Sequence, residues 1–162
     1  SEHQLASIVY WTFGSLTDVV WSQVFISFVI FMAAFLFFMR HSKDYNIIAS
    51  SGDESAKALG VNVKQLRSIS GIAVALLAAT LVSFTGVIGF VGLVAPHIAK
   101  FIVGGEHGLQ LPLSALIGAA LVLLSDTVGR SIINPVIIPV GVVISIIGVP
   151  IFIYMIMRKG KN

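Results

Sequence analysis

The chain has 162 residues, of which 57% are hydrophobic and 10% are charged, and its formal net charge is +3. So few charged side chains cannot coat a water-soluble domain, and the length leaves no room for a second one, so the composition predicts a single integral membrane domain over residues 1–162. Cysteine is absent, which excludes disulfides and thiolate metal ligands, and the ten Lys and Arg have no interleaved stacking aromatics, which argues against nucleic-acid binding.

The N-terminal part contains the first predicted membrane helix. Residues 1–16 begin with Ser1 and lack the basic start, apolar core and cleavage site of a signal peptide, so we expect a fragment of a longer protein. Residues 19–39 contain no Asp, Glu, Lys or Arg. At ~1.5 Å per residue this run reaches ~31 Å, about one hydrocarbon thickness, and it predicts one crossing.

A polar island, Arg40 to Arg67, follows this crossing. Ser51 and Glu54 have the spacing of a capping box, in which the serine side chain accepts a backbone N–H and the glutamate reaches back. Asp53 and Glu54 would then lie in the first turn, where acidic side chains complement the helix dipole. The pattern predicts a short helix that begins near Gly52.

The second half of the island predicts a turn and another short helix, so that the region 51–66 forms a pair. Gly60 is placed to adopt a left-handed conformation after the first helix, and Asn62 with Gln65 can cap the second. Ala56, Leu59 and Gly60 would offer a small apolar face that fits a groove on another protein. From the residues alone, a plain cytoplasmic loop is as good an interpretation.

The long uncharged run of residues 68–99 must contain a break. Its 32 residues would form a helix of ~48 Å, which is too long for one crossing. Glycine and proline crowd its second half, so we place a turn near Gly86 to Gly92. The remaining predicted crossings are residues 69–87, 91–103, 111–128 and 140–157.

Loop charges support five crossings, because Lys and Arg accumulate on the cytoplasmic side. With five crossings, nine of the ten basic residues fall inside and only Arg130 falls outside. Merging the second and third crossings gives six inside and four outside. The five-crossing arrangement also places the N-terminus outside and the island in the cytosol.

Small residues predict close helix packing. Pairs at four-residue spacing, Ser114 with Gly118 and Gly141 with Ser145, allow neighbouring backbones to approach. A longer stripe has four members at the same spacing: Gly71, Ala75, Ala79 and Ser83.

Three ionisable residues near the predicted crossings have two interpretations each. His97 has no second histidine or carboxylate within helical reach, so we favour a buried, hydrogen-bonded structural histidine over a functional one. Asp126 and Arg130 are four residues apart and can pair. A structural ion pair is the simpler interpretation, and Arg130 could also meet an external partner.

Other functional classes fit less well. An intramembrane hydrolase would need a metal motif, paired carboxylates or a serine and histidine that could meet, and none is evident. An ion-coupled carrier would bury an ionisable residue in the middle of the membrane. The five predicted crossings contain one acidic residue, Asp126, and it lies near a helix end. We therefore expect neither catalytic residues nor metal ligands nor cofactors in this chain. A non-transporting membrane scaffold stays open.

Several long motifs resemble the iron-chelate, haem and cobalamin uptake permeases of type II ABC importers. They cover the chain in order: residues 11–16 with Trp21, residues 52–61, residues 89–100, Asp126 with Arg130, and residues 139–143 followed by 147–152. The resemblance implies an all-α membrane fold, with about five transmembrane helices and short cytoplasmic coupling helices, that corresponds to the second half of a ten-helix permease. Relatives commonly carry Glu where Ile138 stands, which departs from the pattern.

The resemblance also implies roles and partners. The chain would dimerise with an identical or different permease subunit, receive a chelate from an extracellular or periplasmic binding protein, and be driven by a cytoplasmic ATPase dimer that holds ATP and Mg. It would lie in a bacterial cytoplasmic membrane, hydrolyse nothing itself, and import a ferric siderophore, with haem or cobalamin as alternatives. Arg130 would dock the external protein, and Pro139, Gly141 and Ser145 would line the pathway. The residues of the coupling helix would be Gly52, Asp53, Glu54, Ala56, Leu59, Gly60 and Val61.

Overall fold

The computed structural model describes residues 11–132 and 138–159, and the regular elements there are helices, which confirms the all-α fold. In chain order they are α2 (Trp21–Arg40), α3 (Ser42–Ala58), α4 (Val63–Thr85), α5 (Val91–Val103), α6 (His107–Ser131) and α7 (Val140–Lys159).

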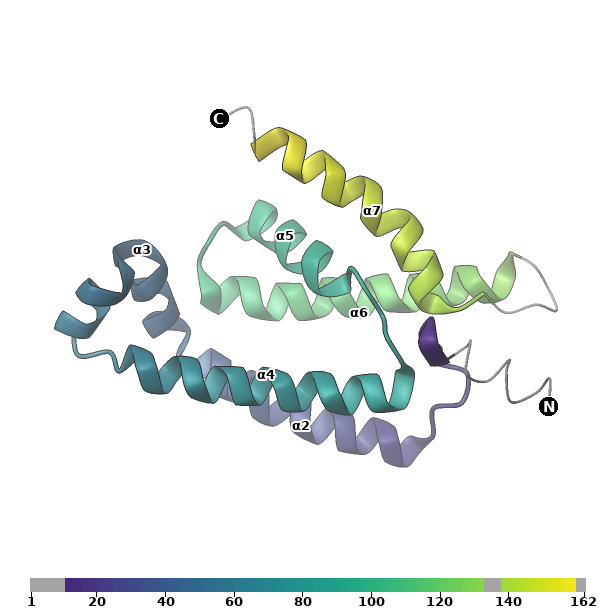
Figure 1. Ribbon diagram of the computed structural model, residues 1–162, viewed down its shortest axis with the longest axis horizontal. Coiled ribbons are helices and arrows are strands. Elements are labelled where there is room, and N and C mark those ends of the chain that lie inside the picture. The colour runs from purple at the N-terminus through teal and green to yellow at the C-terminus, as the bar shows by residue number, and fades with distance from the viewer. Residues whose placement is uncertain (1–10, 133–137, 160–162) are drawn as a thin grey trace.

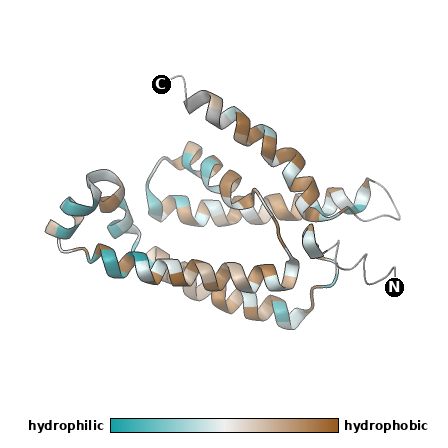
Figure 2. Cartoon of the chain, viewed as in Figure 1, coloured by the Kyte–Doolittle hydropathy of each residue, from teal (hydrophilic) through white to brown (hydrophobic). Residues whose placement is uncertain are grey.

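The long helices pack in neighbouring pairs (Figure 1). α2 lies along α4, while α5 and α7 both pack on α6. At one end of the molecule, α3 lies near the connection between α5 and α6, and Figure 2 shows that hydrophilic residues gather there. We call this the polar end. The loop between α4 and α5 and the start of α7 lie at the opposite end.

Three helices are long and apolar enough to cross a membrane: α2, α4 and α6. α5 has 13 residues, which makes it about 20 Å long and shorter than the ~30 Å hydrocarbon layer. Residues 140–154 of α7 are a second shorter apolar segment. Within the described parts of the chain, three of the five predicted crossings are therefore long enough to be membrane-spanning helices.

The bounds of the helices differ from the predicted ones where side chains cap them. α5 runs over the predicted residues, because Gly86 ends α4 and Gly104 follows α5, both with positive φ. α4 begins at Val63 rather than at residue 69, so the predicted second short helix and the next crossing are one helix. α6 begins at His107 rather than at residue 111, since Glu106 caps it.

Most large apolar side chains of the spanning helices face outward. Trp21, for example, is 87% exposed, and at most 11% of any span is buried. The predicted packing of the stripe Gly71, Ala75, Ala79 and Ser83 is wrong for the described chain, in which all four are exposed. A side chain at Gly71 would meet nothing within 4 Å. These surfaces do not contact the described parts of this chain.

The other two small-residue pairs do lie at close contacts. A Cβ on Gly118 would lie 3.5 Å from Val91 and 3.7 Å from Ala95, so α6 packs closely on α5 there as predicted. Gly141 is buried against the carbonyl oxygens of Phe13 and Val87, so its neighbour is loop backbone rather than a second helix.

Glycine allows two segments to meet at the end opposite the polar end. Gly86 has a φ of 72°, and a Cβ there would lie 1.8 Å from the carbonyl oxygen of Trp11. The backbone N–H of Ser15 donates to the carbonyl of Thr85 at 2.9 Å. The loop of residues 11–16 is therefore held against the end of α4 by backbone contacts that leave no room for a side chain.

We predict that Gly86→Ala destabilises the fold by about 2 kcal/mol, because it combines a positive φ with a clash against backbone. Gly89→Ala is the matched control, since it lies in the same loop and a Cβ there meets nothing within 4 Å. Thermal unfolding in detergent should show a lower Tm for the first variant alone. Equal Tm values would contradict the close contact.

Candidate functional site

The exposed hairpin, residues 52–61, projects from the polar end. Gly52 has a φ of 77° and interrupts α3, so the helix consists of two parts on either side of it. The predicted capping box is wrong: the Ser51 hydroxyl lies 3.2 Å from that of Ser50, and the Glu54 carboxylate accepts from Lys57 at 2.8 Å. Ser51 belongs to the last turn of the preceding helical part, which the sequence analysis missed, so it does not act as a free cap.

The turn after the short helix has the predicted form. Gly60 has a φ of 88°, its N–H donates to Lys57, and the N–H of Val61 donates to the carbonyl of Ala56 at 3.0 Å. This pair of bonds is a Schellman motif, which satisfies the last carbonyls of the helix. Asn62 then caps α4, since its side chain accepts from the N–H of Gln65 at 3.1 Å.

The hairpin has an inside and an outside. Ala56 is fully buried, and Val63 and Leu66 on the adjoining turn of α4 are also buried. The prediction that Ala56 forms part of an outer docking face is therefore wrong, because its methyl group belongs to the inside of the hairpin. Leu59 is 68% exposed and is the large apolar side chain that the hairpin presents outward.

An ion pair ties the hairpin to α4. The guanidinium of Arg67 donates two hydrogen bonds to the carboxylate of Asp53, at 2.6 and 2.8 Å. Such a paired geometry holds both groups in one orientation, although the pair is exposed and contributes about 1 kcal/mol or less. The sequence suggested only a dipole role for Asp53, because nothing local indicates a partner fourteen residues away.

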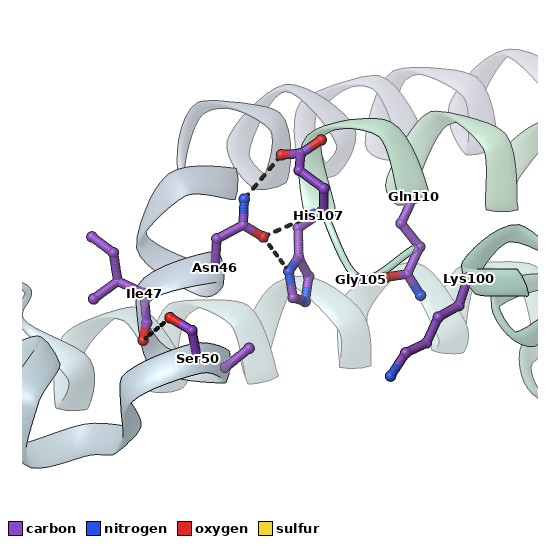
Figure 3. A pocket seen from close by; sticks show the side chains of 9 residues that line it. Asn46, Ile47, Ser50, Lys100, Gly105, His107 and Gln110 are labelled. Atoms are coloured by element: carbon purple, nitrogen blue, oxygen red, sulfur yellow. Dashed lines mark hydrogen bonds between the residues drawn. The ribbon is translucent and has the colours of Figure 1, made fainter. Parts of the chain in front are cut away.

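A second polar cluster, the α3–α6 joint, consists of Asn46, Glu106 and His107 (Figure 3). The Asn46 amide nitrogen donates to Glu106 at 2.9 Å, and its oxygen accepts from the backbone N–H of His107 at 2.8 Å and from His107 Nδ1 at 2.6 Å. Glu106 also accepts from the N–H groups of Gly108 and Leu109, both at 2.9 Å. The sequence does not reveal this joint, since its two halves lie about sixty residues apart.

The joint borders an open hollow of about 720 Å³ between α3 and α6. Hydrogen bonds from the Asn46 side chain, and then from the Gly108 backbone, lower the pKa of the Glu106 carboxyl below its ordinary value. In the hairpin, the hydrogen bond and charge of Glu54 raise the pKa of Lys57 above its ordinary value. Both groups are therefore held in their charged forms.

The ionisable residues away from the polar end make local contacts. Arg130 donates to Asp126 at 2.8 Å, which confirms the predicted ion pair, and its side chain stays 43% exposed. His97 is hydrogen-bonded to the carbonyl of Leu93 at 2.7 Å as predicted, but it is exposed, so the prediction of a buried histidine is wrong. Its position on α5 turns it away from the α6 contact.

The predicted pathway residues lie at the start of α7. Pro139 precedes the helix, Gly141 is buried, and the Ser145 hydroxyl donates to the carbonyl of Gly141 at 2.7 Å. Their role in a pathway stays a prediction. Within the described residues, no three His, Asp or Glu side chains gather in a way that could hold a metal ion.

Comparisons with known proteins agree on one family. Residues 1–158 match the FecCD transport family. A protein of Methanocaldococcus jannaschii that is described as an ABC transporter permease is 42% identical over 98% of this chain and 45% of its own length. The hemin transport system permease protein HmuU of Yersinia pestis is 35% identical over 99% of this chain and 48% of its own.

Structural similarity leads to the same family. A solved structure described as an inward-facing metal-chelate type ABC transporter has a TM-score of 0.88 and 34% identity, covering 98% of this chain and 51% of that one. Two further relatives, each 37% identical, are named for import of iron(3+)-hydroxamate in Bacillus subtilis and of vitamin B12 in Vibrio cholerae. The chain spans about half the length of the curated relatives that it matches.

We predict that Arg67→Lys loosens the exposed hairpin, because lysine keeps the charge but loses the paired hydrogen bonds to Asp53. Backbone amides of residues 52–61 should exchange hydrogen about fivefold faster, which corresponds to ~1 kcal/mol. Lys64→Ala, which removes an exposed basic side chain one turn earlier, should leave exchange unchanged. The same exchange rate in Arg67→Lys as in the unaltered chain would mean that the ion pair contributes nothing to the hairpin.

Proposed function

The chain belongs to the FecCD transport family, and from this premise we propose that it forms the membrane pathway of an ATP-driven ABC importer for a metal chelate. One observation carries the proposal: the hairpin at the polar end is preformed and presents an apolar side chain, Leu59, outward. A soluble partner can bind such a side chain only if the hairpin lies outside the membrane, which agrees with the basic residues around it.

The hairpin would be the contact with the ATPase. Its turn is closed by the Schellman motif and its start is tied to α4 by Asp53 and Arg67, so force applied at Leu59 reaches α4 without first unravelling the helix. The predicted coupling set keeps Gly52, Asp53, Glu54, Leu59, Gly60 and Val61, while Ala56 contributes from the inside by packing. ATP and Mg would be bound by the ATPase dimer, and this chain would hydrolyse nothing.

The opposite end would meet the external binding protein. Arg130 is exposed there and lies at the end of α6 away from the hairpin. Its ion pair with Asp126 leaves part of the guanidinium available to an acidic partner. Pro139, Gly141 and Ser145 stay candidates for the pathway beside it, and a second permease subunit would complete the pathway in a cytoplasmic membrane.

For the substrate we favour a ferric siderophore over haem or cobalamin. Relatives are named for all three classes, and iron(3+)-hydroxamate and siderophore transport both occur among those names. Uptake of labelled ferric hydroxamate, haem and cobalamin, compared in cells with and without this chain, distinguishes them. A non-transporting scaffold would give uptake of none and would not copurify with an ATPase.

We predict that Leu59→Asp abolishes import and leaves capture of the chelate by the external protein unchanged, because a charge replaces the apolar contact with the ATPase. Uptake and binding-protein capture are measured separately. Leu59→Met, which keeps an apolar side chain of similar volume, is the control and should import normally. Normal import by the Asp variant would remove the hairpin from the coupling mechanism.

The predicted topology can be tested with single introduced cysteines, since residues 1–162 contain none. Lys57→Cys should react with a membrane-impermeant thiol reagent only after cells are broken, because Lys57 lies in the cytosolic hairpin. Ser131→Cys, at the other end of α6, should react in intact cells. Reaction of the first variant in intact cells would place the hairpin outside and refute the proposed contact with an ATPase.

A further inference from the structure

The first part of α3, residues 42–51, connects the exposed hairpin to two membrane helices. We call it the strut. It begins directly after α2, ends at Gly52, and lies beside both α4 and α6 at the polar end. Neither the family motifs nor the hairpin itself accounts for the contacts that it makes.

The strut is attached to α6 through the α3–α6 joint. Asn46 uses its amide nitrogen for Glu106 and its amide oxygen for both the backbone and the ring of His107. Because Glu106 also accepts the first N–H groups of α6, the same carboxylate that begins the helix receives the strut. A displacement of Asn46 therefore acts directly on the first turn of α6.

The strut is attached to α4 through the preceding residue. The Tyr45 hydroxyl is hydrogen-bonded to the hydroxyl of Ser70, and the Tyr45 ring lies 6.0 Å from the His107 ring between their centroids. Two adjacent residues thus contact the two helices, Tyr45 through Ser70 of α4 and Asn46 through the start of α6. This arrangement holds the strut to both at once, whereas the hairpin's own ion pair reaches α4 alone.

We propose that the strut transmits movement of the hairpin to α6, and that Asn46 is the positioning residue through which it does so. The inference rests on the proposed function, because it requires an ATPase that moves the hairpin. Without the joint, the hairpin would still pull on α4 through Asp53 and Arg67, but α6 would follow only through apolar contacts that can slide. The joint makes the two membrane helices respond together.

The test is Asn46→Ala in the assembled transporter that contains the full chain. Chelate imported per ATP hydrolysed should fall about fivefold or more, the lower end of coupling between linked sites. Copurification with the ATPase and the rate of ATP hydrolysis should stay unchanged, since the hairpin is intact. Lys43→Ala is the matched control: it removes an exposed polar side chain one turn earlier on the strut and should leave the ratio unchanged.

A covalent replacement separates transmission from simple stability. In the variant with Asn46→Cys and His107→Cys, a short thiol-reactive crosslinker should restore the import per ATP that the uncrosslinked variant has lost. Within residues 1–162, reaction is confined to these two positions because this sequence has no cysteine. A purely structural role of Asn46 would instead lower the yield or the Tm and would gain no coupling from the crosslink.

The outcomes keep the two proposals apart. If the unaltered chain imports no chelate and binds no ATPase, the proposed function fails. If it imports normally and Asn46→Ala leaves the import per ATP unchanged, the strut proposal alone is overturned. Loss of coupling that the crosslinker does not restore in a stably assembled variant also overturns it.

Discussion

The approach of Gly86 to the carbonyl oxygen of Trp11 is the contact on which the arrangement of the helices depends. No side chain fits between these two stretches of backbone, so the loop ahead of α2 and the end of α4 are held at one fixed separation. Gly141 repeats the contact at the start of α7, against Phe13 and Val87. The helices bury few of their own large side chains, so backbone contacts of this kind are important for fixing the positions of the helices.

The two ends of the molecule are held together by different interactions. Backbone packing at the glycine contacts cannot rearrange by small steps, since any shift either clashes or opens a gap. The polar end relies on hydrogen bonds and ion pairs that are partly open to water, so each contributes little to stability. A partner that binds the polar end can therefore change its geometry without disturbing the glycine contacts.

The sequence predicted features that depend on neighbouring residues and missed those that join distant ones. The bounds of α5, the left-handed Gly60, the Asn62 cap and the Asp126–Arg130 pair follow from glycine, capping and four-residue spacing. The α3–α6 joint and the burial of Ala56 depend on residues that only the folded chain brings together. The strut was not predicted because its polar sequence lacks the apolar period that reveals a membrane helix. In addition, the residues around Gly52, where the strut ends, were interpreted as the start of a helix.

The direction of the hydrogen bonds in the α3–α6 joint has a consequence for its response to acidity. A carboxylate can only accept, so Asn46 must turn its nitrogen to Glu106 and its oxygen to His107, and His107 must then donate from Nδ1. The stability that this carboxylate gives the joint is lost as acidity protonates Glu106, and its lowered pKa delays that loss.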